Sequence, residues 1–60
     1  MFGDLLRRDR ERSGLRIAQA AWRLGITPAE YRRLEEEESW PRFETYDRIC
    51  KLFGWPQTFK

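Results

Sequence analysis

The sequence predicts a single all-α domain made of four short helices. Apolar residues recur every three or four positions in four separate stretches, which is the spacing of one buried helix face. Glycine or proline stands where several of these stretches would end or begin. No stretch alternates apolar and polar residues in the manner of a half-buried strand. We therefore expect helices near residues 2–12, 17–24, 28–37 and 43–53, joined by short loops.

The first two helices follow from their apolar stripes and their ends. Phe2 and Leu6 line one side of the 2–12 stretch, and arginines crowd the other side. Gly14 suits the left-handed residue that commonly follows a helix, and Gly25 has the same place after the second stretch. The second stripe consists of Ile17, Ala20, Ala21 and Leu24. Its alanines allow another helix to approach closely.

The third helix has a strong start signal. Thr27 suits the N-cap position, Pro28 suits the first helical position, and Glu30 completes a capping box with Thr27. Tyr31 and Leu34 follow at the spacing of an inward-facing stripe. This segment is therefore expected to be helical and to present its remaining side chains to the outside.

The fourth helix and the tail complete the expected domain. The apolar residues at helical spacing are Phe43, Tyr46, Ile49, Cys50 and Phe53. Gly54 suits the helix end, and the six-residue tail is too short for a further full helix. We assign residues 1–54 to one domain and residues 55–60 to a short aromatic tail. The expected core contains Leu6, Ile17, Ala21, Leu24, Leu34, Ile49 and Phe53.

Length and composition argue against an enzyme, a metal protein and a disulfide scaffold. Sixty residues support only a small core and leave little room for an enclosed active site. The chain has no histidine and one cysteine, Cys50, which is interpreted as a small buried residue. We therefore expect no catalytic residue, no metal site and no cofactor. Because no apolar run suits a membrane span and no signal-peptide pattern is present, we expect a cytoplasmic protein.

Charge is distributed unevenly along the chain. Residues 1–33 carry eight arginines and four acidic residues, whereas residues 34–60 carry four basic and six acidic residues. A basic segment attracts phosphate groups. Candidates for phosphate contact on the first helix, where a solvated face is the alternative, are Arg7, Arg8 and Arg12. The glutamate run at residues 35–38 opposes such binding.

The ordered set of signals resembles the Cro, λ-repressor and Xre type of helix-turn-helix domain. The resemblance spans residues 2–54 and includes the glycine-centred turn before the third helix. The matching residues are Leu6, Arg10, Gly14, Leu15, Ala21, Leu24, Gly25, Ile26, Tyr31, Leu34, Glu35, Pro41, Phe43, Thr45, Ile49, Phe53 and Gly54. The resemblance implies a compact four-helix domain of the λ-repressor-like type that lacks a full fifth helix.

The resemblance also implies that the protein binds double-stranded DNA as a transcriptional regulator. In that family the third helix lies in the major groove and reads base edges with residues near its N-terminus. By position, the base contacts are Arg33, Ala29 and Pro28, and the phosphate contacts are Arg32, Arg23 and Arg16. Arg10 and Glu35 would form a structural salt bridge between the first and third helices. Family members commonly bind as homodimers, and a DNA-binding member would be associated with the nucleoid.

A second interpretation keeps the fold without sequence-specific DNA readout. Ile17 stands where the family has a glutamine, and Pro28 and Ala29 offer no polar group to a base. The glutamates at residues 36–38 would repel phosphate or attract a basic partner, as in a protein-interaction or antitoxin-like module. The candidate partner surface comprises Trp22, Trp40, Trp55 and Phe59. The alternative for these aromatic residues, which we favour for Trp55, is to cover a thin core.

Overall fold

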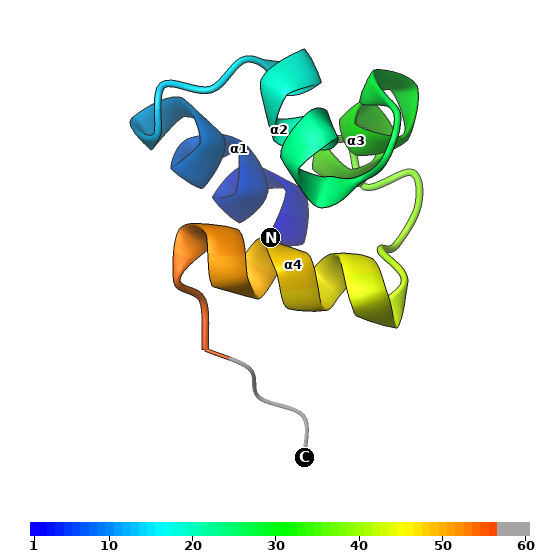
Figure 1. The fold of residues 1–60 in the computed structure, drawn as a ribbon. Helices are drawn as coiled ribbons and strands as arrows, with labels where there is room; N and C mark the ends of the chain where they lie inside the picture. Colours follow the sequence, from blue (N-terminus) through cyan, green and yellow to red (C-terminus); the bar gives the residue numbers. More distant parts are fainter. Residues whose placement is uncertain (57–60) are drawn as a thin grey trace.

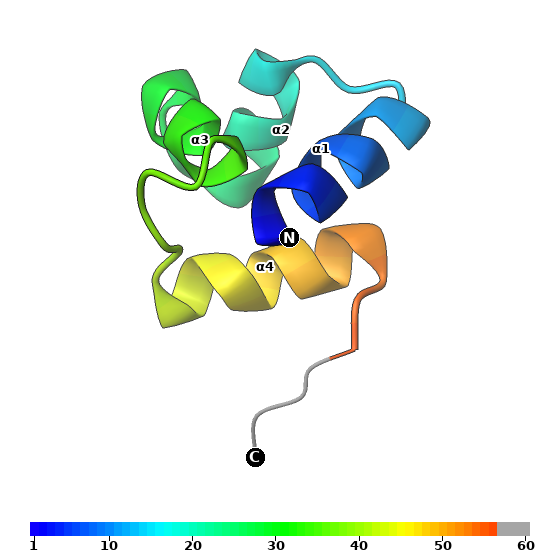
Figure 2. The same cartoon turned by 180° about the vertical axis from the view of Figure 1, so that it is seen from behind.

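Four helices form the domain, and the computed structural model describes residues 1–56 of the chain. In chain order they are α1 Phe2–Arg12, α2 Ile17–Leu24, α3 Pro28–Glu35 and α4 Phe43–Phe53. Figure 1 and the reverse view in Figure 2 show α4 along one side of the molecule, with α1, α2 and α3 on the other side. The described residues contain no strand, which confirms the expected fold class. None of the helices among residues 1–56 has the length and apolarity of a membrane span.

The core is contributed by all four helices. Its buried members are Leu6 of α1, Ala20, Ala21 and Leu24 of α2, Tyr31 and Leu34 of α3, and Ile49 of α4. Ile17 and Phe53, which the sequence also assigned to the core, lie half-buried at its edge. Ala20 and Ala21 are fully buried and let α2 pack closely against α3, its most extensive neighbour. Cys50 is a buried free thiol, as expected.

The turn between α2 and α3 is built from two cap structures. Gly25 has φ 73°, and the N–H of Ile26 donates to the carbonyl of Ala21 over 3.1 Å, which is the Schellman arrangement of a helix end. Glu30 N–H then donates to Thr27 Oγ1 over 3.1 Å, and Thr27 N–H donates to Glu30 Oε1 over 2.8 Å. These caps satisfy backbone groups at both helix ends and fix the direction in which α3 leaves the turn.

Helix α3 ends at Glu35, two residues before the expected end. Glu37 has φ 60°, a left-handed conformation that an L side chain adopts at a cost. The N–H of Glu38 donates to the carbonyl of Arg33 over 2.9 Å, so the same Schellman arrangement closes α3 without a glycine. The expected end at residue 37 lies two residues too far along the chain, because the backbone reverses at Glu37 and a run of glutamates carries no helix-end signal.

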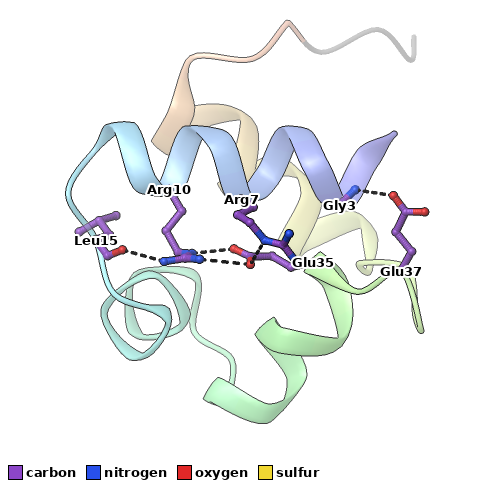
Figure 3. A network of polar contacts seen from close by, with 6 residues as sticks. All are labelled: Gly3, Arg7, Arg10, Leu15, Glu35 and Glu37. Atoms are coloured by element: carbon purple, nitrogen blue, oxygen red, sulfur yellow. Dashed lines mark hydrogen bonds and ion pairs between the residues drawn. The ribbon is translucent and has the colours of Figure 1, made fainter.

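A contact with α1 holds this unusual helix end. The N–H of Gly3, in the first turn of α1, donates to Glu37 Oε2 over 2.8 Å (Figure 3). Gly3 is buried, and a Cβ atom at this position would collide with the carbonyl oxygen of Glu35. The absence of a side chain at Gly3 therefore allows α1 to approach the end of α3, and the Glu37 carboxylate caps the N-terminus of α1.

Trp55 covers the part of the core between the start of α1 and the end of α4. Its ring centroid lies 5.9 Å from that of Phe2 and 6.2 Å from that of Phe53, and its indole N–H donates to Asp9. Trp55 is half-buried against the core cluster. This packing agrees with the favoured interpretation of Trp55 as a core cover rather than part of the candidate partner surface, while Phe59 lies outside the described residues.

Candidate nucleic-acid interface

One face of α3 is free of intramolecular packing. Tyr31, Leu34 and Glu35 are buried, and the opposite side of the helix is exposed. The exposed side carries Pro28, Ala29, Arg32 and Arg33. These are the sequence-predicted residues of the third helix, and the structure brings them together on one side over two helical turns.

A buried ion pair fixes the opposite side of α3 against α1. Arg10 Nε lies 2.6 Å from Glu35 Oε2, and Arg10 Nη2 donates to Glu35 Oε1 over 3.3 Å (Figure 3). Arg7 Nε also approaches Glu35 Oε1 at 3.4 Å, and Arg10 Nη1 donates to the carbonyl of Leu15 over 3.1 Å. The side chains of Arg10 and Glu35 are only 12% and 3% exposed. The expected pair between α1 and α3 is present in bidentate form, the strongest geometry for such a pair.

The electrostatics of Glu35 follow from these contacts. Burial alone would raise the pKa of the Glu35 carboxyl, but hydrogen bonds from Arg10 and the nearby positive charges outweigh it and lower the pKa. The hydrogen bond to Glu35 likewise raises the pKa of the Arg10 guanidinium. Burial, together with an interaction with the Glu35 carboxylate, raises the pKa of the Tyr31 hydroxyl, which lies beside that carboxylate but outside regular hydrogen-bond geometry. The pair therefore stays charged at neutral pH.

Arginines on α2 and α3 have no carboxylate partner. Within residues 1–56, no carboxylate lies within 4.0 Å of a guanidinium nitrogen in any member of this set, which is Arg16, Arg23, Arg32 and Arg33. Arg16 is the N-cap residue of α2, and Arg23 lies in the last turn of that helix. Arg32 and Arg33 therefore form no ion pair with a nearby glutamate, although Glu30 lies close enough to Arg33 for the two charges to interact. All four guanidiniums are exposed and available to an external anion.

The glutamate run is divided between different surroundings. Glu35 is buried in the ion pair with Arg10, and Glu37 caps α1 through Gly3. Glu36 and Glu38 are exposed. Glu37 is also exposed, but one of its carboxylate oxygens accepts the N–H of Gly3 at the start of α1. Glu37 therefore differs from Glu36 and Glu38 in having a structural contact, while all three charges face solvent.

Comparison with protein families gives one result that covers nearly the whole chain. Residues 1–58 match the family described as "Helix-turn-helix domain". The chain belongs to the helix-turn-helix family, in its Cro-like and Xre-like form. No curated protein and no solved structure matches the chain. Domains of this family bind DNA and are typically not enzymes.

The N-terminus of α2 in this helix-turn-helix domain differs from the family pattern. Ile17 is half-buried against the core, so the position of the family's glutamine contributes to packing. The N–H of Arg16 donates to Gln19 Oε1 over 2.8 Å, and the Arg16 side chain forms no ion pair among residues 1–56. The exposed positive charge at the start of α2 is therefore that of Arg16.

Two arginines of α4 and its preceding loop were not identified from the sequence. Arg42, the N-cap residue of α4, and Arg48 line a groove between α3 and α4 together with Arg33. Arg48 Nη1 donates to the carbonyl of Leu24 over 3.0 Å and so fixes the end of α2. Their sequence signal is weak because each is an isolated arginine on a mixed-charge helix, more than eight residues from Arg33.

The remaining predicted partner residues are exposed, and the described residues contain no arrangement for a metal. Trp22 on α2 is 81% exposed, and Trp40 in the loop before α4 is 77% exposed. Within residues 1–56, no three Cys, Asp or Glu side chains gather in a way that could hold a metal ion. The predicted contact residues on the surface are therefore unpaired arginines and the two exposed indoles of Trp22 and Trp40.

Proposed function

We propose that this domain binds double-stranded DNA as part of a transcriptional regulator, with α3 in the major groove. The observation that carries the proposal is the set of unpaired guanidiniums on the helix-turn-helix unit. In this proposal Arg33 makes the principal base contact, because a guanidinium can donate two hydrogen bonds to guanine O6 and N7. The phosphate contacts are Arg16, Arg23 and Arg32. Such contacts supply affinity without sequence information.

The side chains at the start of α3 allow the helix to approach the base edges closely. Pro28 and Ala29 are exposed and small, so they allow the helix N-terminus to come close to DNA. Ala29 can touch a thymine methyl group. We further propose that two copies bind one palindromic site, with half-sites about one helical turn apart. A protein with this role acts in the cytoplasm, on the nucleoid.

Selection from a random-sequence DNA pool at moderate salt tests this proposal. We expect enrichment of a short site, and Arg33→Ala should lower affinity for it by about 1–3 kcal/mol while relaxing the preference at one base pair. Arg12→Ala, an exposed arginine of α1, is the control and should leave the preference unchanged. A parent protein without any sequence preference would overturn the regulator proposal and leave the family assignment intact.

Trp22 supports a second candidate function, a protein-interaction or antitoxin-like module. Its indole is 81% exposed on a helix whose buried stripe lies elsewhere, and exposed tryptophans are enriched among interface hot spots. In this candidate a partner protein loses affinity on Trp22→Ala, and DNA binding is weak and independent of sequence. Titration of the same protein preparations against the selected DNA and against the partner separates the two candidates.

A further inference from the structure

We propose that the groove between α3 and α4 binds an unpaired nucleotide, with its base stacked on Trp40 and its phosphate held by Arg33 and Arg42. The groove has a volume of about 430 Å³. This volume falls in the range of small-molecule sites, which combine apolar walls with a few polar groups. The apolar part of the lining includes Ile26, Leu34, Trp40 and Pro41, and the basic part is Arg33, Arg42 and Arg48.

Trp40 supplies the stacking surface. Its indole is 77% exposed although it follows the last turn of α3 by only a few residues. The ring of Phe2 lies 5.6 Å away at an interplanar angle of 47°, so one edge of the indole rests against α1. This contact holds the ring while most of its surface remains open to a ligand. Base stacking on an aromatic side chain contributes affinity with any base, because every base has a π face.

Arg33 and Arg42 supply the charge for one phosphate group. Within residues 1–56, neither guanidinium forms an ion pair with a carboxylate, and both lie near Glu30. Glu30 already accepts the N–H of Thr27, and that hydrogen bond, with the nearby arginines, lowers the pKa of its carboxyl. The two acidic lining residues, Glu30 and Glu44, oppose further negative charge. The charge balance therefore favours a single phosphate over a polyphosphate.

An unpaired nucleotide fits this groove better than a duplex does. In a duplex the base faces are stacked on their neighbours and are closed to an indole. A free nucleotide and an unpaired nucleotide within a single strand share the required chemistry, which is one open base face and one phosphate. Arg33 belongs to both the groove and the proposed duplex-reading face, whereas Trp40 and Arg42 belong to the groove in this proposal.

Titration followed by the indole ¹⁵N–H signals of the folded protein tests the proposal. The three tryptophan signals are assigned with single Trp→Phe variants. We expect adenosine 5′-monophosphate to shift the Trp40 signal saturably, while the Trp22 signal stays in place. Adenosine and inorganic phosphate should each bind more weakly, because each offers only half of the contacts. A single-stranded oligodeoxyadenylate then identifies the source. Tighter binding of the strand indicates nucleic acid, and binding of the monomer alone indicates a free nucleotide.

Matched variants assign the contacts. Trp40→Ala should weaken nucleotide binding about tenfold or more, and Trp40→Phe should restore part of it. Arg42→Ala should weaken binding of the nucleotide and leave binding of adenosine unchanged. The controls are Trp22→Ala and Arg12→Ala, whose side chains are exposed but do not line the groove. Because Trp40→Ala also removes a contact with Phe2, thermal melts accompany it, and Arg42→Ala serves as the variant that leaves this packing intact.

Several results would overturn the proposal. These are no saturable shift at millimolar nucleotide, an equal shift from inorganic phosphate, an equal loss on Trp22→Ala, or preferential binding of an acidic peptide. The outcome is independent of duplex recognition, because Arg42→Ala and Trp40→Ala are measured without a duplex. Loss of the selected duplex site in the parent protein would overturn the regulator proposal and leave the nucleotide measurement unchanged.

Discussion

The arginines of α1 and those of the α2–α3 unit have opposite surroundings. Each of the four arginines on α1 lies within 4.0 Å of a carboxylate, and their partners are Asp9 and Glu35. The four on α2 and α3 have no such partner among residues 1–56. The two groups are indistinguishable by residue type and number. The difference shows that the location of a carboxylate, and not the count of arginines, decides which surface can attract an external anion.

Breaking the buried pair should have the largest effect on stability. Arg10→Ala leaves Glu35 buried without its main partner, so we expect the free energy of unfolding to fall by about 3–5 kcal/mol. For so small a domain this is a large share of the total. Arg12 lies 3.7 Å from Asp9 and is 71% exposed, so Arg12→Ala should change stability by at most about 1 kcal/mol. Chemical denaturation monitored by circular dichroism measures both. Equal effects would contradict the distinction between a buried and a solvated pair.

Acid should act through the same pair. The folded pKa of Glu35 lies below its ordinary value of 4.5, so the carboxylate contributes stability above that pH, and the contribution is lost as pH falls through the folded pKa. We expect the melting temperature to decrease on acidification below about pH 4.5. The corresponding decrease should be smaller in Glu35→Gln, which has no carboxyl group to titrate. Parallel pH profiles for the two proteins would show that other carboxylates dominate.

Replacing Gly3 by alanine should change the stability of the domain in the direction opposite to that expected from helix propensity alone. Alanine is normally preferred to glycine inside a helix, but a Cβ at position 3 would meet the Glu35 carbonyl. We therefore expect Gly3→Ala to destabilise the domain by about 1–3 kcal/mol. Glu37→Ala should cost about 0.5–2 kcal/mol through loss of the cap. Glu36→Ala is the matched control, because Glu36 is exposed. A stabilised Gly3→Ala protein would show that α1 and α3 are farther apart than described.

The salt dependence of DNA binding sharpens the comparison between the two groups. Replacing Arg16 and Arg23 together by alanine should reduce the slope of log affinity against log salt by about 2, one for each phosphate contact. Replacing Arg8 and Arg12 together removes the same formal charge from α1 and should leave the slope nearly unchanged. Binding is measured at several salt concentrations on one selected duplex. Equal reductions would mean that the α1 arginines also reach the DNA.

The smallest expected effect concerns Tyr31. Its hydroxyl is buried beside the Arg10–Glu35 pair, close to the Glu35 carboxylate but outside regular hydrogen-bond geometry. Because its removal takes away a desolvation penalty together with a weak interaction, Tyr31→Phe should change stability by less than about 1 kcal/mol. Thermal melts of the two proteins measure it. A loss of several kcal/mol would show that the hydroxyl supports Glu35.

The sequence predicts those parts of the molecule that depend on local signals. The caps at Gly25 and at Thr27–Glu30, and the apolar stripes, set the helix positions, and the resemblance supplied the Arg10–Glu35 pair. Other contacts between distant segments were missed. The close approach of Gly3 to α3 has no local sequence signature, because a glycine in a first helical turn is compatible with many environments. The sequence likewise did not indicate that Glu37, and not its neighbours, contacts α1. It also did not indicate which arginines have a carboxylate partner, because that too depends on contacts between distant segments.

In the proposed DNA-binding role, the shortness of α3 limits how much sequence a single copy can specify. Because Glu37 turns the chain, α3 has eight residues, and at about 1.5 Å per residue it extends over only three to four base pairs of about 3.4 Å each. A recognition sequence of that length occurs thousands of times among the roughly 10⁶ or more competing sites of a genome. One copy acting alone would therefore bind at many positions on the chromosome. Occupancy of a single locus would require either a second reader at a fixed spacing or a DNA shape that few sequences adopt.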